Sequence, residues 1–316
     1  FNSTSCCSET DSYGGIHAYG SDYLTIDNVH FFESFTGFFN YYSREVVVKN
    51  SVFDRGTLTN YWSGMYLNYV HDGELINNEI KKYSYGIYLN YVYQGLKITN
   101  NHIHNNTSSG IYLSSTGSSL YPSNPIKIVN NRIIDNYYGL RVLGYYDTSS
   151  RYIIFEDNLV KSSTYRGIYC SNYCQDWTVE NNTFDGDSDQ TYGVYFRHGY
   201  RTKFGNNTFS DHTDYDLYLE SCGNGTGSNS TKFFYNTYSS ISITSSCQVD
   251  IYHNLNVKTV EQDSDPFSNV ELEVKDSSKT YYKTPHWGGS DALTDSSGLI
   301  SDSMLIRSGY YSSSST

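Results

Sequence analysis

A short motif recurs along this chain every 22 to 29 residues, and it limits the possible folds more than any other feature. It reads glycine, apolar residue, tyrosine, apolar residue. Clear copies begin at Gly64, Gly86, Gly110, Gly167 and Gly193, and weaker copies at Gly15, Gly37, Gly139, Asp216 and Ser240. The alternation of apolar and polar residues is typical of a strand with one buried face. A unit this short cannot bury its apolar side alone, so the copies must stack.

A second motif follows each copy and ends in an asparagine two residues before an apolar or aromatic position, with a looser fit at its two ends. Its asparagines are Asn28, Asn50, Asn78, Asn101, Asn131, Asn158, Asn182, Asn207, Asn236 and Asn254. A buried amide must be paired, so we expect each to bond to its counterpart in the next coil. The side chains expected inside are Ile87, Leu89, Ile98 and Ile103, and those expected outside are Tyr88, Lys97 and Thr99. Together the motifs predict an all-β chain, a right-handed parallel β-helix of about ten coils over residues 1–258.

The segments Leu96–His104 and Ile126–Ile133 resemble parallel β-helix repeats of the pectate-lyase-like superfamily, of the type found in archaeal and bacterial cell-surface proteins. The resemblance covers roughly residues 13 to 258 and implies the same right-handed fold. A leucine-rich repeat and a β-propeller are the alternatives for a repeating chain, but the sequence frames of both are missing.

The repeat stops before a polar linker at residues 259–268. Beyond it, residues 269–316 are expected to form a partial immunoglobulin-like or carboxypeptidase-regulatory-like β module with a Ser/Thr-rich end. Forty-odd residues cannot complete a sandwich of seven strands. Either the module caps the helix, or further chain or a neighbouring subunit completes it. Because the chain opens at Phe1 without a methionine, we expect a piece of a longer polypeptide.

Six cysteines favour an oxidising, extracellular or cell-surface location. Cys222 and Cys247 occupy matching turns of neighbouring coils, which predicts a disulfide. Cys170 and Cys174 lie on either side of one turn and are expected to bridge it. Cys6 and Cys7 are expected to bond to each other or to upstream chain.

Seven glycosylation sequons support the same location, and they begin at Asn2, Asn105, Asn106, Asn181, Asn206, Asn224 and Asn229. In two of them the second asparagine is the expected ladder residue. Its predecessor must then face outward, which predicts Asn181 and Asn206 as accessible acceptors.

Two clusters are candidate metal ligands, although the fold requires no cofactor. Carboxylates alternate in one loop and recur in the loop of the next coil, at Asp185, Asp187, Asp189, Asp211 and Asp214. These loops could chelate Ca²⁺ between coils, or they could be solvated acidic turns, and they lack the EF-hand pattern. His102 and His104 share the outer face of one strand, but no third ligand is visible in the sequence.

Tyrosine is in excess, with 35 residues, and its placement is regular. The outward position after each glycine is occupied by Tyr66, Tyr88, Tyr112, Tyr169, Tyr195 and Tyr218. The stripe either only stabilises the sheet or also forms an interface, by stacking on glycans or docking a subunit. The residue pattern alone is compatible with both interpretations.

The net charge of −12 excludes several classes of partner. No basic stripe is present to neutralise phosphates, so no nucleic acid is expected. No apolar run reaches transmembrane length, so no direct membrane span is expected in this segment. Acidic polysaccharides are expected to be repelled.

No catalytic residues are predicted, because the signatures of the resembled hydrolases and lyases are missing. The nearest approach, Arg197-His198-Gly199, lacks its partners. The favoured function is a non-catalytic extracellular structural or adhesive protein, a subunit of a surface layer, sheath or filament. Its expected partners are copies of itself, or other surface proteins and glycans. The alternatives are a carbohydrate-active enzyme, either a polysaccharide lyase or a glycoside hydrolase, and then a virus tailspike.

Overall fold

The computed structural model describes residues 15–58, 62–92, 94–114, 124–143, 151–222, 230–245 and 247–255, with shorter pieces between residues 258 and 311. The described residues form strands, turns and bends, with no helix among them. The contacts between residues divide the chain into two compact units. The first takes in residues up to Thr231, Asn236–Gln248 and the last residues, and the second takes in Lys232–Tyr235 and Val249–Tyr310.

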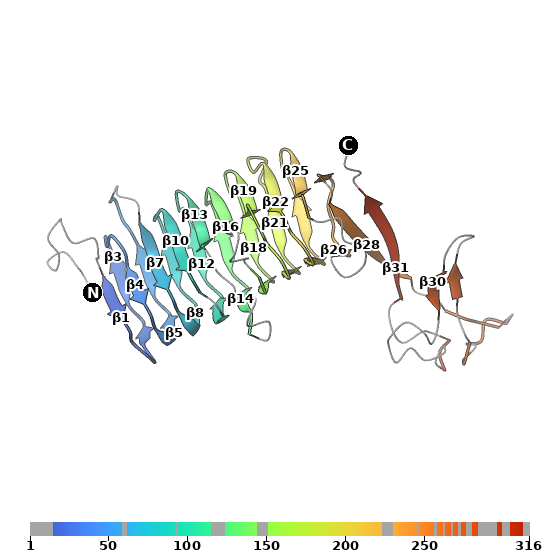
Figure 1. Ribbon diagram of the computed structural model, residues 1–316, viewed down its shortest axis with the longest axis horizontal. Coiled ribbons are helices and arrows are strands. Elements are labelled where there is room, and N and C mark those ends of the chain that lie inside the picture. Colours follow the sequence, from blue (N-terminus) through green and yellow to red (C-terminus); the bar gives the residue numbers. More distant parts are fainter. Residues whose placement is uncertain are drawn as a thin grey trace. The chain divides into compact units, whose positions relative to one another are not determined.

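The first unit is a parallel β-helix with three sheets, whose strands stack in register from coil to coil (Figure 1). Sheet 1 consists of β1 (Ile16–Tyr19), β4 (Phe38–Tyr41), β7 (Ser63–Asn68), β10 (Tyr85–Asn90), β13 (Ser109–Ser114), β16 (Tyr138–Leu143), β19 (Arg166–Cys170), β22 (Tyr192–Arg197), β25 (Tyr215–Glu220) and β27 (Ile241–Thr244). Sheet 2 runs through β2 (Thr25–Asp27), β5 (Arg44–Lys49), β8 (His71–Ile76), β11 (Gln94–Thr99), β14 (Ile126–Val129), β17 (Ile153–Glu156), β20 (Thr178–Glu180) and β23 (Lys203–Gly205). Sheet 3 consists of β3 (His30–Phe32), β6 (Val52–Asp54), β9 (Glu79–Lys81), β12 (His102–His104), β15 (Arg132–Ile134), β18 (Leu159–Lys161), β21 (Thr183–Asp185) and β24 (Thr208–Ser210).

The coil predicted from the sequence is confirmed, with one strand from each sheet per turn. All ten expected glycine-motif strands are present in sheet 1, whereas sheet 3 has eight strands. The stack therefore holds eight coils with all three strands, and about ten were expected. The strands are parallel throughout because each pairs with the equivalent segment one turn later along the chain.

The core consists of inward columns, one side chain per coil. In sheet 3 the aligned inward residues include Phe31 and Phe53, whose rings stack at 4.6 Å, and Phe184 and Phe209, whose rings stack at 4.8 Å. The residues expected inside, Ile87, Leu89, Ile98 and Ile103, are all fully buried. Lys97 is exposed and Tyr88 half-buried, as the alternation predicts.

The turn between sheets 2 and 3 contains the expected asparagine ladder. In each step a side-chain oxygen accepts the backbone N–H of the preceding coil, as Asn131 does for Asn101 at 2.9 Å. The same amide donates to Asn158 of the next coil at 3.0 Å and to the carbonyl of Ile98 at 2.9 Å. The ladder members are Asn78, Asn101, Asn131, Asn158, Asn182, Asn207 and Asn236. Every buried amide of the ladder interior is thus paired.

The prediction that Asn28 and Asn50 belong to the ladder was wrong. Asn50 has φ +52° and is exposed, and Ser51 takes the ladder position, with its N–H bonded to Asn78 at 3.0 Å. Asn28, with φ +55°, also lies one position too early. This first position needs left-handed backbone, which asparagine tolerates better than most residues. In the Asn-Asn pair, the first residue therefore meets the need for left-handed backbone and the second forms the ladder. Asn254 lies among residues whose side chains are not described.

A second ladder, which the sequence did not reveal, occupies the turn between sheets 3 and 1. Asn106 accepts the N–H of Tyr83 at 3.0 Å, and Asn136 accepts the N–H of Asn106 at 3.1 Å. Gln190 continues it by accepting the N–H of Ser163 at 3.2 Å. Because the residue type changes from coil to coil, no repeated letter marks this ladder.

The second unit contains most of β26 (Thr231–Phe234), β28 (Gln248–Leu255) and β31 (Met304–Tyr311), with an antiparallel pair of β29 (Glu273–Lys275) and β30 (Thr280–Lys283). Within the expected linker, Val260 bridges Pro266 in antiparallel fashion around a tight turn. Most residues of the expected C-terminal module lie outside the described part, so its sandwich assignment stays a prediction.

Candidate functional site

The outer face of sheet 1 has an aromatic column that one arginine interrupts, and at β13 this face is covered, with Tyr112 only 8% exposed. The predicted tyrosines stand in register, so that Tyr88 aligns with Tyr66 and with Tyr112. The column runs His17, Phe39, Tyr66, Tyr88, Tyr112, Arg141, Tyr169, Tyr195 and Tyr218. An arginine therefore stands in the middle of the tyrosine stripe. We name this set column 1.

A parallel column, which we name column 2, comes from the residue just before each glycine. It runs Ser63, Tyr85, Ser109, Tyr138, Arg166, Tyr192 and Tyr215, the last of which precedes Asp216 in place of a glycine. The rings of Tyr85 and Tyr88 lie 5.3 Å apart, so the columns share a face. They do so because Gly86 is turned inward, where a Cβ would lie 2.7 Å from Ile103. The sequence signal for column 2 is an aromatic residue just before several of the glycines.

Arg166 of column 2 lies inside a cage of four tyrosines. Its guanidinium carbon is 4.4 Å from the ring centre of Tyr165, 4.3 Å from Tyr169, 5.2 Å from Tyr192 and 4.1 Å from Tyr195. Its Nη2 donates to the Tyr165 hydroxyl at 3.1 Å. The side chain is only 9% exposed, and its Nε has no hydrogen-bond partner among the described residues. Cation–π contacts of this kind contribute about 0.5–2 kcal/mol each.

Arg141 of column 1 is the second cation of this face and is more accessible than Arg166. It lies 5.5 Å from the ring centre of Tyr112 and 5.2 Å from that of Tyr138. Within the described part of the chain, neither Arg141 nor Arg166 has a carboxylate at ion-pair distance. A cation without a carboxylate beside it attracts an anionic ligand. A chain with a net charge of −12 therefore has a locally cationic face.

A carboxylate closes one end of this face. The Tyr195 hydroxyl donates to Glu220 Oε2 at 2.7 Å, and Arg197 lies 3.6 Å from the same carboxylate. Burial and then the bond to Glu220 raise the pKa of Tyr195 above its usual value. Burial likewise raises the pKa of Tyr138 and Tyr192. These phenols keep their protons at neutral pH and can act as hydrogen-bond donors.

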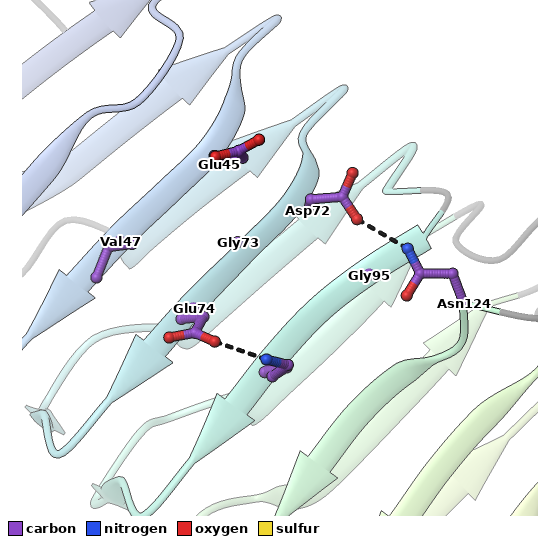
Figure 2. A pocket seen from close by; sticks show the side chains of 8 residues that line it. Glu45, Val47, Asp72, Gly73, Glu74, Gly95 and Asn124 are labelled. Carbon is purple, nitrogen blue, oxygen red and sulfur yellow. Dashed lines mark hydrogen bonds and ion pairs between the residues drawn. The ribbon is translucent and has the colours of Figure 1, made fainter.

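A hollow among the described residues lies elsewhere, on the outer face of sheet 2 (Figure 2). It measures 320 Å³ and includes Glu45, Asp72, Glu74, Lys97 and Asn124. As Figure 2 shows, its polar groups largely satisfy one another, with Asn124 donating to Asp72 at 2.8 Å and Lys97 to Glu74 at 2.7 Å. The hollow is therefore a weaker candidate than the face of sheet 1.

The predicted acidic calcium loop is not assembled. Asp185 pairs with Lys161 at 2.8 Å, and Asp187 accepts from the Ser162 hydroxyl at 3.1 Å. Asp189, Asp211 and Asp214 are exposed. Among the residues that the structure describes, these carboxylates do not bring three ligand atoms together. The solvated-turn interpretation fits the five aspartates better.

Asp216, which begins a weak copy of the motif, is buried in a polar pair. It accepts from His212 Nδ1 at 2.7 Å and from the backbone N–H groups of Ser239 and Ser240. Burial alone would raise the pKa of Asp216, but these bonds outweigh it and lower the pKa to about 2. The pair has almost no contact with solvent, so its role is structural.

The sequons divide between exposed and buried asparagines. Asn181 and Asn206 are exposed with φ +56° and +51°, as predicted, and their ladder neighbours are buried. Asn105 is also exposed. Asn106 was a wrong choice of acceptor in the folded chain, because it is 2% exposed and bonded within the second ladder. Glycosylation itself stays a prediction, and Asn2, Asn224 and Asn229 lie outside the described residues.

Both predicted disulfides that involve described cysteines are present. Cys170 pairs with Cys174, and Cys222 pairs with Cys247 across neighbouring coils, with Cα separations of 6.3 and 4.4 Å. Cys6 and Cys7 lie outside the described residues. No described segment forms a helix long and apolar enough to span a membrane.

Three comparisons place the chain among known proteins. The model of the right handed beta helix region family matches residues 4–150 and 119–262. The Azotobacter vinelandii mannuronan C-5 epimerase AlgE4 A-module is similar in structure, with a TM-score of 0.51 and 16% identity over 71% of this chain and 61% of that chain. The periplasmic alginate epimerase AlgG (TM-score 0.44, 17% identity, 72% of this chain and 49% of that chain) and pectate lyase Pel9A (0.43, 15%, 64% and 60%) have lower scores.

No protein of curated function matches the chain by sequence. The chain spans about half to three fifths of the solved structures that it resembles. At these identities the likeness establishes the fold alone. The family model covers well over half of the chain, including the strands of all eight complete coils. The chain belongs to the right-handed β-helix family.

Proposed function

We propose that this chain binds an acidic polysaccharide along the outer face of sheet 1 and acts on it as a carbohydrate-active enzyme. The observation that carries the proposal is the pair Arg141 and Arg166, two cations without acidic partners among the described residues, set between tyrosines. Tyrosine rings present flat apolar surfaces that suit sugar rings, and arginine binds carboxylates through two parallel hydrogen bonds. A polymer of sugar acids offers both features repeatedly, as the two columns do.

The earlier expectation of repulsion rested on the net charge of the whole chain. Ligand binding depends on the local field, and the described charges facing out from the strands of sheet 1 are Arg141, Arg166, Arg197 and Glu220. Asp214, just before β25, adds a second carboxylate, which is hydrogen-bonded to Tyr192. Three cations and two anions leave a small excess of positive charge, which favours a polyanion at this face. The acidic surface elsewhere would then orient the polymer rather than exclude it.

The chemistry proposed is removal of the proton next to the sugar carboxylate. A guanidinium on that carboxylate stabilises the negative charge that develops when the proton leaves. Tyr195 lies against Arg166 and donates to Glu220. In the proposed step the Tyr195 oxygen takes the C5 proton of a sugar acid held by the arginines, while its own proton passes to Glu220. The electrons of the broken C–H bond move into the sugar carboxylate. They then either take up a proton at the other face of C5 or expel the glycosidic oxygen at C4, which is protonated by water. Because the structurally similar A-module is a mannuronan C-5 epimerase, mannuronan is the first polymer to test.

The test incubates the protein with polymannuronate or polygalacturonate in D₂O and follows the polymer by NMR. The proposal predicts deuterium at C5 or new unsaturated ends, with both lost in Glu220→Gln while polymer binding is retained. Binding without either change would support the second candidate below. Neither binding nor turnover by the wild type would overturn the proposal.

A non-catalytic structural or adhesive role is the second candidate. The observation in its favour is that the columns already satisfy one another, as where the rings of Tyr195 and Tyr218 stack at 4.8 Å and Arg166 is largely covered. In this account the face stabilises the sheet, or docks copies of the chain or other surface proteins. The disulfides and exposed sequons support an extracellular location in either case.

A further inference from the structure

We propose that the outer face of sheet 3 carries a transition-metal site formed by Glu79, His102 and His104. These three side chains come from neighbouring coils, with Glu79 on β9 and both histidines on β12. One ligand atom from each lies within 4.8 Å of the others, and they are the one such group among the described residues. The site faces away from sheet 1 and is independent of the function proposed above.

The strand register creates this cluster. His102 aligns with Glu79, and His104 aligns with Lys81, so the two histidines flank inward Ile103 and share the outer face. Their imidazole rings stack with centres 4.1 Å apart. His104 Nε2 already contacts Glu79 Oε1 at 3.2 Å. The third ligand could not be seen in the sequence, because it lies one coil away from the histidines.

The chemistry of the donor set favours Zn²⁺. Two imidazoles and one carboxylate, with water in the fourth position, form a common zinc arrangement with bonds of about 2.0–2.2 Å. Ligand atoms around tetrahedral zinc lie roughly 3.4 Å apart, so binding requires small rotations of these half-buried side chains. Ca²⁺ prefers oxygen ligands and is not expected to compete.

A neighbouring amide supports the site. Asn105 Nδ2 lies 2.9 Å from His104 Nδ1, and a flip of that amide would let its oxygen accept a hydrogen bond from the ring N–H, as partners of metal-bound histidines do.

The competitor for the site is an ammonium group. Lys81 Nζ donates to Glu79 Oε1 at 2.7 Å, where a metal would bind. The same nitrogen lies 3.6 Å from Asp54, which gives it a second partner when a metal displaces it. Removing the ammonium should therefore strengthen metal binding, an effect that a merely structural cluster would not produce.

The experiment measures Zn²⁺ binding to the full, untagged chain by equilibrium dialysis and calorimetry at pH 7.5. We expect one Zn²⁺ per chain, a loss of at least tenfold in affinity for Glu79→Gln, and no binding at this site in the variant His102→Ala/His104→Ala. Lys81→Met should bind about three to ten times more tightly. Excess Ca²⁺ should not displace the zinc.

The matched control is His30→Ala, which removes an exposed histidine from the same outward position of sheet 3, on β3. It should bind zinc as the wild type does. Circular dichroism and the melting temperature without metal verify that each variant is folded. An absence of stoichiometric zinc in the wild type, or unchanged zinc binding in the double histidine variant, would overturn the proposal. Lys81→Met gives an independent answer if the double variant fails to fold, because weaker or unchanged binding there would also contradict it.

Discussion

Polar side chains are fully paired at the turn between sheets 2 and 3, whereas the arginines on the outer face of sheet 1 lack acidic partners among the described residues. At the turn, each amide of the ladder interior has its partners one coil up and one coil down, as Asn131 does. On the outer face, Arg141 and Arg166 are surrounded by tyrosine rings, with no carboxylate beside them in the described part of the chain. Both regions belong to the same stack of coils, so the fold itself does not explain the difference.

The difference separates stability from binding. A buried polar group without partners costs stability, so a chain selected only for folding pairs such groups, as the turn does. Charges left without acidic partners on an aromatic surface are what a ligand of opposite charge would complete. Three changes test this distinction, and their expected effects on the free energy of unfolding decrease in the order given.

The largest effect is expected at the turn. Asn131→Ala removes the acceptor of the Asn101 N–H and the donor to Ile98, so buried groups of two coils lose partners. We expect a loss of about 2–4 kcal/mol in the free energy of unfolding, measured by denaturant titration. The matched change Asn130→Gly alters the exposed left-handed neighbour and should cost less than about 1 kcal/mol. Equal costs would contradict the division of roles within the Asn-Asn pair.

An intermediate effect is expected from the buried pair of Asp216 and His212. The folded-state pKa of Asp216 is about 2, below the ordinary value of 3.8. Its contribution to stability is therefore complete above about pH 4 and is lost as the pH falls toward 2. Asp216→Asn should cost about 2 kcal/mol near neutral pH and flatten this acid limb. An unchanged acid limb in thermal melts between pH 2 and 5 would show that the carboxylate does not stabilise the fold.

The smallest effect on stability is expected on the outer face of sheet 1. Arg166→Gln removes cation–π contacts but also removes a largely buried charge, and these changes oppose each other. We expect a change within about 1 kcal/mol, together with at least a tenfold loss of affinity for polyuronate. A loss above 2 kcal/mol with unchanged binding would support a column that only stabilises the sheet.

The sequence predicted the coil, the alternation of inner and outer residues and most of the ladder, because each rests on a period that recurs in one chain. It placed Asn50 wrongly, since one letter serves two adjacent positions with different backbone demands. It missed the ladder of Asn106 and Asn136 because the residue type there changes between coils.

Contacts between coils account for the remaining differences. Glu79 meets His102 only through the register of β9 and β12, which spacing along the chain does not fix exactly. Arg166 belongs to column 2 only because the glycine after it turns inward. In a stacked fold, a functional site combines residues from different coils, whereas a sequence motif contains neighbouring residues of one coil. The sequence therefore indicated the face of sheet 1 but not its cations.

The most direct test of the central claim is affinity electrophoresis of the folded protein through gels that contain polymannuronate, polygalacturonate or an uncharged glucan. The account predicts retardation by at least one of the acidic polymers alone, weakened by salt and abolished in the variant Arg141→Gln/Arg166→Gln. The variant Tyr88→Ser/Tyr112→Ser should weaken it partly. Equal mobility of the wild type in all gels, or equal retardation of the double arginine variant, would contradict the account.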